Sequence, residues 1–115
     1  MSPHIEARLW LAQRASAMVL AVAVIVHLAT IIYAVRGGLS AAEIAARLSG
    51  DVAWLAFYLV FVLAVAVHAP LGLRTVLGEL TPLAPRTVDA LAALFAVLLA
   101  TTGAVAAAAL FTLEV

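Results

Sequence analysis

The stretch HAPLGLRTVLGE, residues 68–79, lies where the second of three long apolar runs reaches its first charged side chain. It holds an ionisable residue, His68, inside the run and a cation, Arg74, at the end of it. Ionisable residues within a membrane span are costly, so they generally face a bundle interior, a cavity or a cofactor. An imidazole is also a common ligand of iron. His68 is therefore the first candidate for a functional residue, and His27, within the first apolar run, is the second.

The composition indicates a protein whose solvent is lipid. Of 115 residues, 68% are hydrophobic and 10% are charged, and the mean hydropathy is +1.26. A soluble domain is typically about 45–50% apolar and about 25% charged. The chain has no cysteine, which excludes disulfides, thiolate catalysis, iron–sulfur clusters and cysteine zinc sites. It has no lysine and a net charge of zero, so it lacks the basic patch that a nucleic-acid-binding protein needs.

The apolar runs predict an all-α integral membrane protein made of a single domain, residues 1–115. A membrane-spanning helix needs about 20 apolar residues. The three predicted spans are residues 15–35, 52–73 and 90–113. Between the first two, Ser40 and Glu43 have the spacing of a capping box, which predicts a short amphipathic helix on the membrane surface.

The arginines predict how the chain is oriented. They divide unevenly between the two sides of the predicted membrane: Arg8, Arg14, Arg74 and Arg86 on one side, and Arg36 and Arg47 on the other. Cytoplasmic loops carry an excess of arginine and lysine. We therefore expect the amino terminus to be cytoplasmic.

The two intramembrane histidines are expected at different depths. With Arg14 and Arg74 taken as markers of one surface, the helical rise puts His27 about 20 Å and His68 about 9 Å from it, a difference of about 10 Å. Two axial ligands of one haem iron must lie at nearly one level. Either His68 shares a haem with a histidine of another chain, or each histidine holds its own haem together with a partner. Each could instead form a hydrogen bond to a neighbouring helix.

The layout and the end of the second span resemble the cytochrome b membrane-anchor subunits of succinate dehydrogenase and fumarate reductase. That family carries the pattern H-x-x-x-G-I-R-H-x-x-x-D, and here His68, Gly72 and Arg74 match it. Glu79 stands at the acidic position, and Thr75 replaces the second histidine. A second family pattern, H-R-x-[ST]-G, falls on residues 13–17. Within it Arg14 and Ser16 match, whereas Gln13 and Ala17 replace the histidine and the glycine.

The resemblance implies a subunit that holds haem b and helps to form a quinone site. It implies flavoprotein and iron–sulfur partners, a second membrane-anchor chain or copy, and a bacterial inner (cytoplasmic) membrane. The residues it implies at the haem are His68, Gly72 and Arg74, with His27 as the iron ligand of a second haem in a two-haem version. The residues it implies at the quinone are Trp10, Arg14 and Ser16.

The resemblance makes the chain part of an enzyme without a catalytic site of its own. No nucleophile–base pair, phosphate loop or metal motif occurs in the sequence, so the chemistry would be that of the cofactors. Two other functions fit the same composition. One is a haem-free structural or assembly subunit of a membrane complex. The other is a small transporter subunit that uses His27 as a proton relay. A visible spectrum distinguishes them, because only a cytochrome has a reducible haem band.

Overall fold

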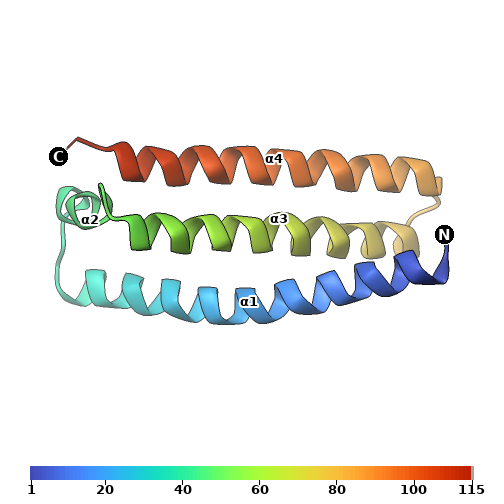
Figure 1. Ribbon diagram of the computed structural model, residues 1–115, viewed down its shortest axis with the longest axis horizontal. Helices are drawn as coiled ribbons and strands as arrows, with labels where there is room; N and C mark the ends of the chain where they lie inside the picture. Colours follow the sequence, from blue (N-terminus) through green and yellow to red (C-terminus); the bar gives the residue numbers. More distant parts are fainter. Residues whose placement is uncertain (115) are drawn as a thin grey trace.

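The computed structural model describes residues 1–114, and within them the chain forms four helices: α1 (Pro3–Arg36), α2 (Ala41–Leu48), α3 (Val52–Leu80) and α4 (Pro85–Thr112). The three long helices lie side by side, with α3 between α1 and α4 and antiparallel to both (Figure 1). Each of the three is long and apolar enough to cross a membrane. The predicted all-α architecture, with a short helix between the first two spans, is confirmed.

The two ends of the bundle differ in what they carry. The amino terminus and the α3–α4 connection lie at one end, and α2 and the carboxyl terminus lie at the other (Figure 1). The longest dimension is 49 Å, which exceeds the hydrocarbon core of a bilayer, about 30 Å thick. The helices therefore extend beyond the hydrocarbon into the interfacial zones.

All three long helices extend beyond their predicted spans, because hydropathy marks only the lipid-embedded part. The first predicted span begins at residue 15, but α1 begins at Pro3. The third predicted span begins at residue 90, but α4 begins at Pro85. The second predicted span ends at residue 73, but α3 continues to Leu80. It stops there because Thr81 precedes a proline, which disfavours helical backbone, and Thr81 is extended with φ −130° and ψ 154°.

Local side-chain contacts explain where the helices around the first loop begin. The predicted capping box at α2 is present: Glu43 N–H donates to Ser40 Oγ (3.2 Å), and Ser40 N–H donates to Glu43 Oε2 (2.7 Å). Asp51 caps α3 by accepting the backbone N–H groups of Ala53 and Trp54 through Oδ1 at 2.9 and 3.1 Å. These caps satisfy amide donors that helix starts leave unpaired.

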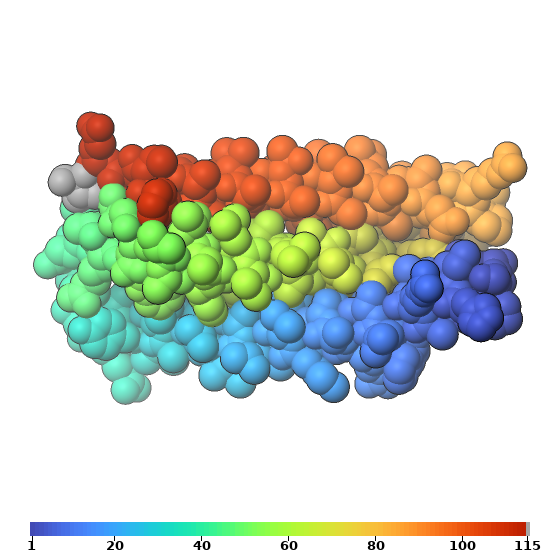
Figure 2. Space-filling model, viewed as in Figure 1, coloured from blue at the N-terminus to red at the C-terminus, as the bar shows by residue number. Residues whose placement is uncertain are grey.

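Close packing joins α3 to α4. The buried residues of α4 are Val88, Ala92 and Ala107. At Gly103, a Cβ atom would lie only 2.6 Å from Cγ1 of Val62 on α3. Small residues let membrane helices approach closely in this way. Few other side chains are buried, so most of the apolar surface of the long helices is exposed to lipid or to another chain. Figure 2 shows one face of this surface.

Candidate functional site

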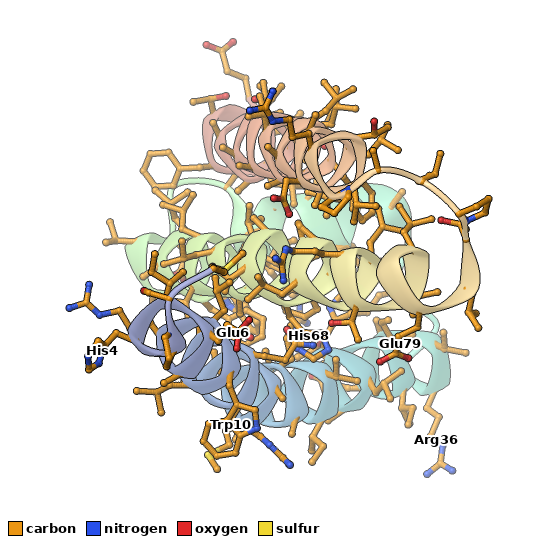
Figure 3. All side chains as sticks on the ribbon, turned by 90° about the vertical axis from the view of Figure 1, so that its right-hand side faces the viewer. His4, Glu6, Trp10, Arg36, His68 and Glu79 are labelled. Atoms are coloured by element: carbon orange, nitrogen blue, oxygen red, sulfur yellow. The ribbon has the colours of Figure 1, made fainter. Side chains whose placement is uncertain are left out.

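His68 lies on α3 in the interface with α1, and one side chain of α1 meets its ring. Figure 3 shows His68 between the two helices. Ser16 Oγ lies 3.5 Å from His68 Nδ1. The same hydroxyl donates to the backbone carbonyl of Gln13 at 3.0 Å, and Ser16 is only 7% exposed. The other ring nitrogen, Nε2, has no hydrogen-bond partner among residues 1–114 and is not fully buried.

His27 lies further along α1, at a different level from His68. Its ring meets Tyr58 and Phe61 of α3 edge-on, with centroid distances of 5.9 and 5.6 Å. From Ser16, which is level with His68, the helical rise to His27 is about 16 Å. The expected difference of about 10 Å took Arg74 to lie level with Arg14. In the structure Arg74 instead lines a groove with Trp10, which precedes Arg14 on α1, so the two histidines are further apart than expected. His27 and His68 are therefore too far apart to ligate one iron.

The surroundings of His27 form a pocket at the α2 end of the bundle. It has a volume of about 470 Å³, is almost wholly apolar, and is bounded by α1, α2 and α3. Its polar lining comes from His27, Thr30, Tyr33, Arg47 and Tyr58. Nδ1 of His27 is buried and has no hydrogen-bond partner among residues 1–114.

A second hollow lies between α1 and α3 at the amino-terminal end. It has a volume of about 250 Å³, and its lining residues are Glu6, Leu9, Trp10, Gln13, Leu71, Arg74 and Thr75. The amide of Gln13 lies against Gly72, where a Cβ atom would be 3.7 Å from Gln13 Nε2. Oε1 of Gln13 is buried without a partner in the described chain. The side chains of Gln13 and Arg74 thus line the same groove.

Arg74 also has a partner that the sequence did not indicate. Its Nε–H donates to Asp89 Oδ1 on α4 at 2.7 Å, and the two side chains are 34% and 51% exposed. This ion pair is outside the membrane-spanning stretch predicted for α4 and is open to water.

The three residues predicted at a quinone site do not form one cluster. Arg14 stacks on Trp10, with its guanidinium carbon 5.4 Å from the ring centroid. Figure 3 shows Trp10, which is exposed, on the side of α1 turned away from α3. Ser16 instead points into the α1–α3 interface beside His68. Of the three, only Trp10 lines the groove with Arg74.

Comparison with known proteins gives one match that covers most of the chain. A family model described as the succinate dehydrogenase/fumarate reductase transmembrane subunit matches residues 1–109. The chain belongs to this family. No curated protein and no solved structure matches it. The chain is therefore a membrane subunit of a succinate dehydrogenase or fumarate reductase complex, and the resemblance carried by its two motifs is confirmed.

Two residues of the subunit's candidate site were missed as functional residues in the sequence. Gln13 stands where the family pattern has a histidine, so its place in the motif was the available signal. Asp89 carried no signal, because its contact with Arg74 depends on how α3 and α4 pack. No group of three or more potential metal-ligating side chains occurs among residues 1–114.

Proposed function

We propose that the chain is the membrane-anchor cytochrome b subunit of a succinate:quinone oxidoreductase or fumarate reductase, and that His68 ligates haem b through Nε2. The observation that carries the proposal is the state of the imidazole of His68. One ring nitrogen meets Ser16 at 3.5 Å, and the other is not fully buried and is unpartnered in the described chain. Ligating histidines usually engage their second nitrogen in this way, so the donor set fits a haem.

A second protein ligand for that haem would have to come from another chain. His27 is about 16 Å away along the helix axis, and the third histidine, His4, lies near the amino terminus. The partner is a second membrane-anchor chain or copy. Gly72 follows His68 by one helical turn and lies against the amide of Gln13, while Arg74 would supply a cation for a haem propionate.

The number of haems, one or two, depends on His27. Its Nδ1 is buried without a partner in the described chain, and the adjoining pocket of about 470 Å³ is almost wholly apolar. The pocket supports His27 as the iron ligand of a second haem, which a partner chain would complete. A neighbouring helix that supplies a hydrogen bond to Nδ1 is the alternative.

The groove at the amino-terminal end is the proposed quinone site. Arg74 and Gln13 offer hydrogen-bond donors around it, Trp10 lines its edge, and a quinone carbonyl needs donors. Arg14, stacked on Trp10, lies at the outer rim, where a partner chain would complete the pocket. The excess of arginines at this end supports a cytoplasmic position in a bacterial inner membrane, next to the flavoprotein and iron–sulfur subunits.

When bound, haem and quinone supply the redox chemistry, and the protein supplies ligands, hydrogen bonds and insulation. Electrons would pass between the iron–sulfur partner and the quinone near the cytoplasmic surface. Whether the complex oxidises succinate or reduces fumarate depends on the partner subunits.

A dithionite-reduced minus oxidised spectrum of the purified complex, with haem quantified per chain, tests the proposal. We expect a b-type band that is lost or halved in His68→Ala and unchanged in the matched control His4→Ala, whose side chain is exposed. A separate loss in His27→Ala would establish the second haem. An intact but colourless wild-type complex, or full haem content in His68→Ala, would refute haem ligation and leave a haem-free anchor.

A further inference from the structure

Ser16 has a hydroxyl group whose only proton is already committed. Its Oγ–H donates to the carbonyl oxygen of Gln13 at 3.0 Å, within the same helix. A serine hydroxyl has one donor and two acceptor lone pairs. The oxygen of Ser16 can therefore offer only a lone pair to His68 Nδ1, which lies 3.5 Å away on α3. Because the bond to the carbonyl is the shorter of the two, we assign the hydrogen of the longer contact to the imidazole.

This constraint selects one tautomer of His68. A neutral imidazole carries its proton on one ring nitrogen and a lone pair on the other. If Nδ1 donates its hydrogen to Ser16, then Nε2 carries the lone pair. Nε2 is the nitrogen that is not fully buried and is unpartnered in the described chain, and a metal ligand needs that lone pair.

We propose that Ser16 is a positioning residue that holds His68 in the Nδ1–H tautomer and thereby tunes the haem, an inference that rests on the proposed haem ligation. It assigns Ser16 a different role from the quinone contact implied by its motif. Ser16 is buried at 7% exposure, and its only hydroxyl proton is donated to Gln13, so it has no donor left for a quinone carbonyl.

The hydrogen bond should favour the oxidised haem. An acceptor at Nδ1–H makes the imidazole more basic, and a more basic ligand stabilises ferric over ferrous iron. Loss of the acceptor should therefore raise the midpoint potential. At 3.5 Å the bond is long, so its effect is expected to be modest.

The test measures the midpoint potential of the haem in the purified complex for wild type, Ser16→Ala, Ser16→Thr and Ser16→Cys. For Ser16→Ala we expect the ferrous-to-ferric ratio at a fixed potential to rise about threefold to tenfold, which is a shift of about 30–60 mV at about 59 mV per tenfold for one electron. Ser16→Thr keeps the hydroxyl and should stay near wild type, and Ser16→Cys, a weaker acceptor of similar size, should fall between. Complexes that assemble without haem in Ser16→Ala but with haem in Ser16→Thr also support the role.

Thr102→Val is the matched control. It removes a hydroxyl that likewise bonds a carbonyl of its own helix, Leu98 O at 2.6 Å, on the exposed side of α4. A potential in Ser16→Ala no different from that in Thr102→Val would overturn the inference. If instead His68→Ala keeps its haem, the proposed ligation itself fails, so the two failures are distinguishable.

Discussion

The substitution Gly103→Ala tests the register of α3 against α4 most directly. The new methyl group would lie 2.6 and 2.8 Å from the two methyl groups of Val62 and 3.3 Å from its Cβ. Val62 cannot move away cheaply, because a β-branched side chain in a helix has one strongly preferred rotamer. The two helices must separate instead.

The expected cost is best measured against a second glycine. Ala in place of Gly favours a helix by about 1 kcal/mol through propensity alone. Gly78, on α3, has nothing within 4 Å of a built Cβ, so Gly78→Ala should show only that gain. Overpacking of a tight contact costs about 1–3 kcal/mol. Gly103→Ala should therefore be about 1–3 kcal/mol less stable than Gly78→Ala.

The assay is the free energy of unfolding by sodium dodecyl sulfate titration in mild detergent, followed by circular dichroism. Val62→Ala removes the two clashing methyl groups. Its combination with Gly103→Ala should therefore be more stable than the sum of the single effects predicts, with a coupling of about 1 kcal/mol or more. Equal stabilities of Gly103→Ala and Gly78→Ala, or additive effects in the double variant, would refute this packing of α3 against α4.

Two further predictions concern charged groups outside the hydrocarbon. The contacts of Glu43 with Ser40 hold the pKa of its carboxyl below the ordinary 4.5, so the capping box is complete at neutral pH and is lost as pH falls through that lowered pKa. Amide hydrogen exchange should show that α2 loses protection in that acidic range. The variant Ser40→Ala should lack this protection at every pH. Protection of α2 that does not change with pH would contradict the prediction. Asp89→Asn removes the ion pair with Arg74. Because both side chains are exposed, the free energy of unfolding in the same detergent titration should fall by less than about 1 kcal/mol. A larger loss would mean that the pair is shielded from water.

Within the candidate site, the grouping of residues that the sequence suggested differs from the one in the structure. His68 was predicted from its motif and its place in the second span, and it does lie in a helix interface. Trp10, Arg14 and Ser16 were taken together because the family resemblance implies all three at a quinone. A helix turns by about 100° per residue, however, so Ser16 faces α3 whereas Arg14 stacks on Trp10 away from it.

The sequence by itself determined the membrane class, the three spans, the short capped helix and the family. The physical reason is that hydropathy, helix caps and motifs depend on residues that are neighbours along one helix. Only the tertiary structure decided which residues meet across helices: Ser16 with His68, Arg74 with Asp89, and Gly103 with Val62. These pairings depend on the register and rotation of one helix against another. Side-chain packing between helices sets both, and no local pattern in the chain records them.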